Sequence, residues 1–244
     1  MNNKYVLIRG LARGNGHWGN FLKVLASFDP KAEIEIYEIP GSGTRFKEST
    51  PIDPAEIIND FRRHCQFVKN KTPFILCGIS LGGMLALKWL EVFPDDVLKT
   101  YVINSSLHSL SPFYQRLRFN NYLSILEILM TLSPEEMEIK ILQLTSNNQD
   151  LSPQIVEKLV SFSKNHPVAR LNVLRQIYLA SKINVSRQLK QPIQVIQSSQ
   201  DHLVNPVCSQ RIADYLGAAL IVHSTAGHDI PLDDPEWLAK TLMG

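Results

Sequence analysis

The sequence predicts an α/β fold in which a mostly parallel sheet of about six strands has helices on both faces and carries an inserted helical segment. Short apolar runs alternate with amphipathic stretches through most of the chain. Some runs, such as Phe74–Cys77, are apolar without a break, which is typical of strands buried on both faces. Between Leu107 and Lys190 the alternation stops, and apolar residues recur at helical spacing.

The expected strands are rich in β-branched or aliphatic residues and are bounded by glycine, proline or polar residues. They are Tyr5–Arg9, Glu33–Ile39, Phe74–Cys77, Thr100–Asn104, Ile193–Gln197 and Ala219–Val222. The helices expected between them are Pro54–Lys69, Leu81–Phe93, Pro206–Leu216 and Asp234–Met243. Asp53 and Asn205 stand at the N-cap positions of two of these helices.

The segment without strands divides the chain into a core and an insertion. Ser133-Pro134 and Ser152-Pro153 are typical helix starts, in which a capping serine is followed by proline. We therefore expect several helices inserted between two strands, forming a lid over the site. The expected domains are a core of residues 1–106 and 191–244 and a helical cap of residues 107–190.

Composition excludes several classes of protein. The 244 residues are 44% hydrophobic and 20% charged, as in ordinary globular proteins, and the net charge of +2 gives no case for nucleic-acid binding. The three cysteines are widely spaced, so neither a metal site nor a disulfide framework is expected, and no cofactor is implied. The apolar stretches are too short for a signal peptide or a membrane span, which predicts a cytoplasmic protein.

One short motif carries chemistry, the G-x-S-x-G pattern in Gly78-Ile79-Ser80-Leu81-Gly82. It follows an apolar strand and opens an amphipathic helix, which is the strand–turn–helix setting that a nucleophilic serine requires. The glycines let strand and helix approach closely around a sharp turn with unfavourable backbone angles. The alternative, a glycine–serine turn that merely starts a helix, is less favoured because of these flanks. Ser80 is the predicted nucleophile.

A serine hydroxyl needs a base, and in this arrangement the chain order is serine, acid, histidine. His228 follows Gly227 after the last expected strand, where a glycine-containing loop can present the imidazole ring. The other histidines precede the serine, lie in the insertion, follow the acid or end a strand: His17, His64, His108, His166, His202 and His223. His228 is therefore the predicted base.

The acid should follow the penultimate strand, Ile193–Gln197, and Asp201 lies in the loop that comes next. Its predicted role is to orient the histidine and to stabilise its charged form. Asp229 directly follows the histidine in sequence, so its side chain is poorly placed to reach the ring. Asp233 and Asp234 are interpreted as helix-capping residues.

Two backbone amides are needed to stabilise an oxyanion. One belongs to the residue after the nucleophile, Leu81, and the other to the loop after the first strand, where Leu11 follows Arg9 and Gly10.

The motifs together resemble the α/β-hydrolase superfamily along nearly the whole chain. They are Gly10 with Trp18 downstream, Pro40-Gly41-Ser42-Gly43, the serine motif, Asp201-x-x-Val204-x-Pro206 and Gly227-His228. Within the superfamily the chain looks most similar to small carboxylesterases such as the pimeloyl-acyl-carrier-protein methyl ester esterases. Many relatives have a histidine that supports the oxyanion loop where this chain has Arg9. The sheet also starts at the strand before that loop, which predicts six strands rather than eight.

Substrate contacts are sought in the insertion and the first loop. Residues 107–190 carry ten Lys/Arg and six Asp/Glu, a net charge of +4. A basic cap could dock an acidic acyl carrier protein or hold a carboxylated substrate, although solvated helix faces explain the charge more simply. The candidate substrate-binding residues are Gly10, Trp18, Phe113, Arg116 and Phe119.

The resulting hypothesis is a serine hydrolase that cleaves a small or carrier-linked carboxylic ester or thioester through an acyl-enzyme. A lyase that uses the same triad on a menaquinone-type precursor is one alternative. A non-catalytic binding protein on the same scaffold is another, although such a protein has no need for the three side chains in register.

Overall fold

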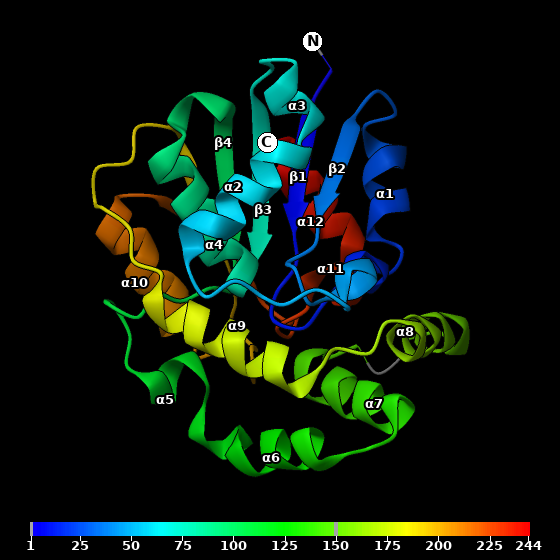
Figure 1. Ribbon diagram of the computed structural model, residues 1–244. Coiled ribbons are helices and arrows are strands. Elements are labelled where there is room, and N and C mark those ends of the chain that lie inside the picture. Colours follow the sequence, from blue (N-terminus) through cyan, green and yellow to red (C-terminus); the bar gives the residue numbers. More distant parts are fainter. Residues whose placement is uncertain (1, 149–150) are drawn as a thin grey trace.

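The structure is a computed structural model that describes residues 2–148 and 151–244. Within these residues, six parallel strands form one sheet in the order β2-β1-β3-β4-β5-β6 (Figure 1). The strands are β1 Lys4–Ile8, β2 Glu33–Tyr37, β3 Phe74–Ile79, β4 Val97–Ile103, β5 Ile193–Ser198 and β6 Ala219–His223. The predicted six-stranded parallel sheet is confirmed, and each strand lies within a few residues of its expected range.

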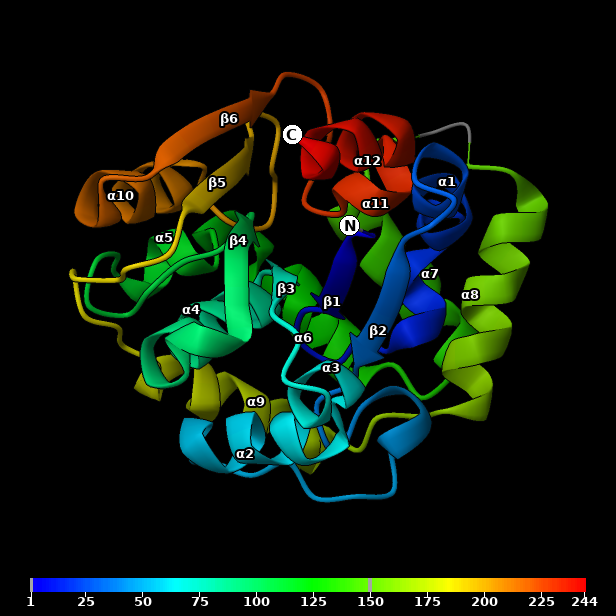
Figure 2. The same cartoon turned by 90° about the horizontal axis from the view of Figure 1, so that it is seen from above.

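Helices pack on both faces of the sheet: α1 Phe21–Phe28 and α12 Pro235–Met243 on one face, and α2 Pro54–His64, α4 Leu81–Val92 and α10 Val207–Leu216 on the other. Successive side chains of a strand point to opposite faces, so a central strand contributes to both cores. In β1, Val6 and Ile8 join the core cluster that contains residues of α2, α4 and α10. Tyr5 and Leu7 join the opposite cluster, with residues of α1 and α12. Figure 2 shows α1 and α12 on one side of the sheet and α2 and α4 on the other.

Helices fill the chain between β4 and β5. They are α5 Phe113–Arg116, α6 Tyr122–Met130, α7 Pro134–Thr145, α8 Pro153–Asn165 and α9 Arg170–Lys182. We call them the inserted helices. Figure 1 shows them gathered below the sheet, at the carboxyl ends of its strands. None of the described residues of this segment is in a strand, as expected.

The structure confirms some of the expected helix boundaries and N-caps and differs at others. The expected helix over residues 54–69 is divided at Cys65, whose extended backbone separates α2 from α3 Gln66–Lys69. Asp53 and Ser133 accept amide hydrogen bonds as N-caps, whereas Ser152 makes no such bond. Helix α1 and the short α11 Ile230–Asp233 have no counterpart among the expected helices, and neither makes a side-chain cap bond.

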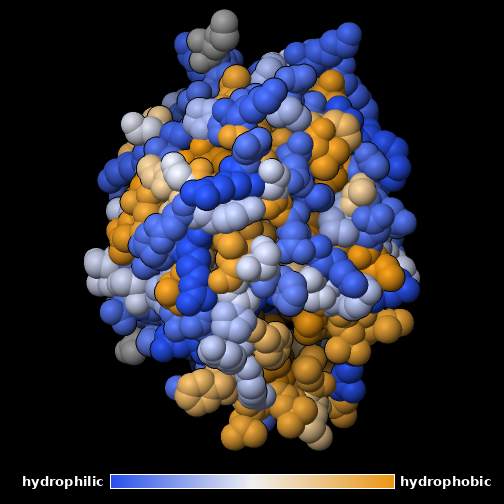
Figure 3. Space-filling view, turned by 90° about the vertical axis from the view of Figure 1, so that its left-hand side faces the viewer, coloured by the Kyte–Doolittle hydropathy of each residue, from blue (hydrophilic) through white to orange (hydrophobic). Residues whose placement is uncertain are grey.

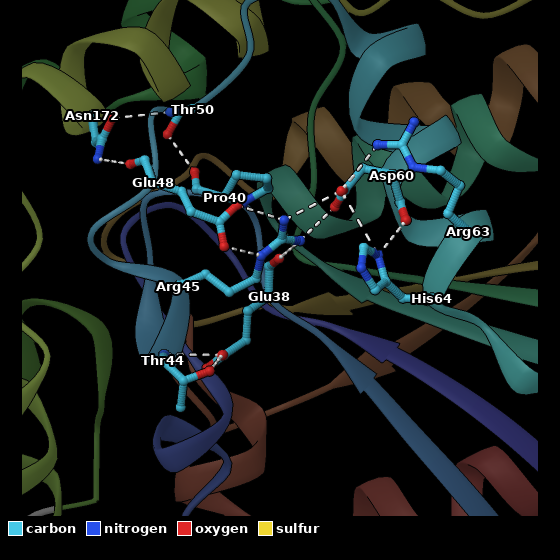
Figure 4. Close-up of polar contacts among 10 residues, drawn as sticks. All are labelled: Glu38, Pro40, Thr44, Arg45, Glu48, Thr50, Asp60, Arg63, His64 and Asn172. Atoms are coloured by element: carbon cyan, nitrogen blue, oxygen red, sulfur yellow. Dashed lines mark hydrogen bonds and ion pairs between the residues drawn. The ribbon is translucent and has the colours of Figure 1, made fainter.

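The loop after β2 ties the core to an inserted helix (Figure 4). Arg45 pairs with Asp60 of α2 and with Glu48. Asn172 of α9 accepts a hydrogen bond from the Thr50 amide at 3.0 Å and donates one to the Glu48 carbonyl at 2.9 Å. Helix α9 is therefore tied to this loop by polar contacts of Asn172.

None of the helices formed by residues 2–148 and 151–244 has the length and apolar character needed to cross a membrane.

Candidate active site

Ser80 stands at a sharp turn between β3 and α4. Its backbone angles are φ 55° and ψ −118°, a combination that is costly for any residue other than glycine. The turn is held from both sides: the Ser80 amide donates to the Ile103 carbonyl at 2.9 Å, and the Ser105 hydroxyl donates to the Ser80 carbonyl at 2.7 Å. Strain of this kind persists where the surrounding structure fixes it, and it is common at reactive residues.

The flanking glycines are required by space. A Cβ on Gly78 would lie 2.2 Å from the Gly82 carbonyl oxygen, and one on Gly82 would lie 2.3 Å from the Ile8 carbonyl oxygen. Both contacts are with backbone, which cannot give way cheaply. The close approach of strand and helix that the motif predicts is therefore present.

His228 and Asp201 meet in a buried hydrogen bond. The distance between His228 Nδ1 and Asp201 Oδ2 is 2.7 Å, and both side chains are almost inaccessible to water. The other carboxylate oxygen, Oδ1, accepts the amides of Leu203 at 2.8 Å and Val204 at 2.9 Å. Burial by itself would lower the pKa of His228, but the charge of Asp201 and the hydrogen bond to it hold that pKa above its ordinary value.

Asn104 joins the loops that carry these residues, and the sequence reasoning missed it. It follows β4 with φ 44°, a left-handed conformation that asparagine tolerates better than most residues. Its Nδ2 donates to the His228 carbonyl and to the Ser198 hydroxyl, both at 2.9 Å, and its Oδ1 accepts the Ser198 amide at 2.7 Å. An asparagine at the end of a buried strand was the signal that could have found it.

Asp233 also supports the histidine loop, and its interpretation as a helix cap was wrong. Its Oδ2 accepts the Gly227 amide at 2.6 Å and the Asn147 amide at 3.0 Å, so it joins the loop to the end of α7. Asp234 does cap a helix, because it accepts the Trp237 amide at the start of α12.

The first loop lies directly against the nucleophile. A Cβ built on Gly10 would be 3.1 Å from Ser80 Cβ and 3.7 Å from Ser80 Oγ. Within the described residues, neither the Leu11 amide nor the Leu81 amide donates a hydrogen bond. Next to Leu11, Ala12 has φ 57°, and its amide is held by the buried side chain of Gln176 in α9 at 2.7 Å.

Arg9, in the loop after β1, forms a buried ion pair. Its Nη1 and Nη2 donate to the two carboxylate oxygens of Asp229 at 2.9 and 2.6 Å. The guanidinium carbon lies 5.0 Å from the centre of the Trp18 ring. Trp18 is fully buried and packs against Phe21, so its placement gives no support to the expected contact with substrate.

A second buried cluster joins the first loop to the inserted helices. Arg13 pairs with Glu138 of α7 at 2.7 Å, and the Ser163 hydroxyl of α8 donates to Glu138 at 2.8 Å. His17 lies 3.0 Å from Ser163 Oγ. Burial and the nearby charge of Arg13 lower the pKa of His17 to about 4, which leaves this histidine neutral at pH 7.

The expected substrate contacts in the insertion are dispersed. Arg116 donates to the Ser106 hydroxyl at 3.1 Å and to the Ala180 carbonyl at 2.9 Å, so it connects α5 to the core and to α9. Phe113 and Phe119 are largely exposed. Figure 3 shows an apolar surface at the lower end of the molecule, the end at which α5 and α6 lie in Figure 1. The exposed large hydrophobic residues on α5, α6 and the adjoining turns are Phe113, Tyr114, Phe119, Tyr122, Leu123, Leu126, Met130 and Leu132.

The sequence matches a family model described as serine aminopeptidase, S33, over residues 17–235. Among curated proteins it is similar to monoacylglycerol lipase ABHD6 of Mus musculus, with 26% identity over 94% of this chain and 72% of that protein. The corresponding protein of Homo sapiens is 25% identical over the same shares. These relatives support the superfamily, and the narrower resemblance to pimeloyl esterases stays a prediction.

Solved structures share the fold. The enol-lactonase from Burkholderia xenovorans LB400 has a TM-score of 0.78 and 14% identity, covering all of this chain and 90% of its own. MGS-M2, an α/β hydrolase from a Medee basin deep-sea metagenome library, has a TM-score of 0.74 and 19% identity, covering all of this chain and 88% of its own. The predicted α/β-hydrolase fold is confirmed.

Proposed function

Since the chain belongs to the serine aminopeptidase S33 family of α/β hydrolases, we propose that it hydrolyses a carboxylic ester or thioester through an acyl-enzyme on Ser80. The observation that carries the proposal is the buried 2.7 Å bond between His228 and Asp201, on loops that Asn104 binds to the strand beside Ser80. A histidine oriented in this way through Nδ1 presents Nε2 as the base.

In the proposed first half-reaction, the Ser80 hydroxyl oxygen attacks the ester carbonyl while its proton passes to His228 Nε2. The carbonyl oxygen becomes an oxyanion, which the Leu11 and Leu81 amides stabilise. As the tetrahedral intermediate collapses, the bond to the leaving alcohol or thiol breaks and that group takes the proton from His228. Water then attacks the acyl-enzyme by the same steps, which releases the acid and restores the serine.

We infer that the inserted helices act as a cap over this site and that the substrate carries a fatty acyl chain. The cap role is supported by their place at the carboxyl ends of the strands (Figure 1) and by the contacts of Gln176 and Glu138 with the first loop. An acyl substrate is supported by the relatives described as monoacylglycerol lipases and by the apolar surface on α5 and α6. An acyl carrier protein stays a candidate partner.

The test combines active-site labelling with product analysis. A fluorophosphonate probe should label wild-type protein at Ser80, and Ser80→Ala should lose both labelling and turnover of monoacylglycerols and p-nitrophenyl esters of graded chain length. Ser109→Ala, which changes an exposed serine, is the matched control and should behave as wild type. Reaction in H₂¹⁸O should place one ¹⁸O atom in the released acid.

Turnover that persists in Ser80→Ala would overturn the proposed mechanism. Products without ¹⁸O would favour the lyase alternative, and protein that neither labels nor turns over any ester would favour the binding protein.

A further inference from the structure

We propose that Arg9 and Asp229 are a positioning pair. The pair holds the first loop, which carries the Leu11 amide, against the histidine loop, which carries His228, and so keeps the oxyanion donor and the base correctly placed around Ser80. This inference rests on the proposed function and assigns two residues that touch neither substrate nor reacting atoms.

The pair lies at the junction of the two loops. Arg9 immediately precedes Gly10, whose backbone packs against the Ser80 side chain, and Asp229 immediately follows His228. The two residues are 220 positions apart and make two short hydrogen bonds at 2.9 and 2.6 Å. Both side chains are 4% exposed, so water cannot substitute for either partner.

Each partner is itself immobilised. The Arg9 guanidinium lies over the Trp18 ring, which is fully buried in the core. The Asp229 amide donates to the Thr145 carbonyl at the end of α7 at 2.9 Å. Burial by itself would raise the pKa of Asp229, but the charge of Arg9 and the hydrogen bonds from it hold that pKa below its usual range, so the carboxylate is charged when it pairs.

Stability alone is a poor explanation for such a pair. The desolvation of two buried charges largely cancels their attraction, and well-packed apolar residues often replace a buried ion pair without loss. What a bidentate arginine–carboxylate pair adds is geometry, because two parallel hydrogen bonds fix both planes at once. Here the guanidinium and the carboxylate that are fixed in this way stand on the first loop and on the histidine loop, which carry the proposed oxyanion donor and the base.

The pair also faces His228 with opposite charges. The charged groups that act on this histidine are Asp201 and Asp229, which raise its pKa, and Arg9, which lowers it. Arg118 lies nearby, but it donates to the backbone carbonyl of Asp201 at 2.8 Å. Removing Arg9 leaves the negative charge of Asp229 uncompensated and should raise the pKa of His228. Removing Asp229 leaves the positive charge of Arg9 uncompensated and should lower it.

The test measures kcat, KM and the rate of fluorophosphonate labelling against pH in Arg9→Gln and Asp229→Asn. Both variants should lose on the order of 100-fold in kcat and in labelling rate with little change in KM, because reacting groups are displaced while substrate binding is kept. The acidic limb of the profile should move to higher pH in Arg9→Gln and to lower pH in Asp229→Asn, by roughly half a pH unit or more. Arg9→Lys keeps the positive charge but loses the planar guanidinium that makes two parallel hydrogen bonds. Its pH profile should therefore keep the acidic limb of wild type, while its kcat should still fall.

A double variant separates positioning from folding. Arg9→Met combined with Asp229→Leu removes both charges, so it should melt close to wild type while kcat stays low. Arg62→Gln breaks an ion pair with Asp96 that lies away from the site, at 2.7 Å, and is the matched control for the loss of an arginine contact; its kcat and pH profile should be those of wild type.

Recovery of wild-type kcat in the double variant, or acidic limbs that stay in place in both single variants, would overturn the positioning role. Failure of the proposed function looks different, because the wild-type protein itself would then show no Ser80-dependent turnover or labelling.

Discussion

Replacing Asn104 by alanine should destabilise the fold and disorder the base together. Asn104 is buried, and its side chain satisfies the Ser198 amide and the His228 carbonyl. A buried polar group left without a partner costs about 1–3 kcal/mol, and alanine at φ 44° adds roughly 1 kcal/mol of backbone strain. Because two such groups lose their partner, we expect the free energy of unfolding to fall by about 3–7 kcal/mol, which lowers the melting temperature by roughly 6–28 °C in a domain of this size.

Asn104→Gly separates the two contributions. Glycine loses the same hydrogen bonds but adopts a positive φ without strain, so it should be less destabilising than alanine by about 1 kcal/mol. Asn59→Ala, at an exposed position within α2, is the matched control and should change the free energy of unfolding by a few tenths of a kcal/mol at most.

The assays are urea unfolding followed by circular dichroism, and fluorophosphonate labelling below the melting temperature of each variant. Labelling of Ser80 should slow in Asn104→Ala even where the protein is fully folded, because the His228 carbonyl is no longer held. An Asn104→Ala protein that unfolds within 1 kcal/mol of wild type and labels at the wild-type rate would refute this account of how the histidine loop is anchored.

Three further predictions concern the elbow, the buried histidine and the contact of α9 with the first loop. Gly82→Ala should abolish labelling and lower the melting temperature, since its Cβ would lie 2.3 Å from the Ile8 carbonyl oxygen, and a variant that labels normally would contradict this. The pKa of His17 is about 4 in the folded protein and about 6.5 when unfolded, so its contribution to stability is complete above pH 6.5 and is lost as the pH falls toward 4. His17→Gln should therefore remove up to about 3 kcal/mol of the difference in unfolding free energy between pH 7 and pH 4, as measured by urea titrations. Gln176→Ala frees the Ala12 amide and should lower kcat more than it raises KM, whereas an effect on KM alone would assign Gln176 to substrate binding.

Much of the fold could be predicted because its signals are local. Phe74–Ile79 is apolar without a break and is buried as a strand of a two-sided parallel sheet. The boundaries were less certain, as at Cys65, where one residue in an extended conformation divides a helix that the apolar spacing predicts to be continuous.

Part of the arrangement around Ser80 was determined by the sequence itself, because a Cβ on Gly78 would clash with the backbone of Gly82 across the same strand–turn–helix crossing. The need for glycine at position 82 depends on the tertiary structure as well, since a Cβ there would meet the Ile8 carbonyl oxygen of β1. The chain order likewise indicated which aspartate to pair with His228, and these side chains lie 2.7 Å apart. The pairing of Asp201 with His228 could be predicted because it depends only on the order of the strands and loops, and not on how side chains pack.

What holds the loops in place was decided by the tertiary structure alone. Arg9 and Asp229 are 220 residues apart, and Gln176 is 164 residues from the amide that it binds. In the sequence these side chains look like ordinary surface groups, because charge and polarity do not reveal whether water or a partner will solvate them. Burial decides this, because a charged group that is removed from water is stable only where the fold places a partner against it.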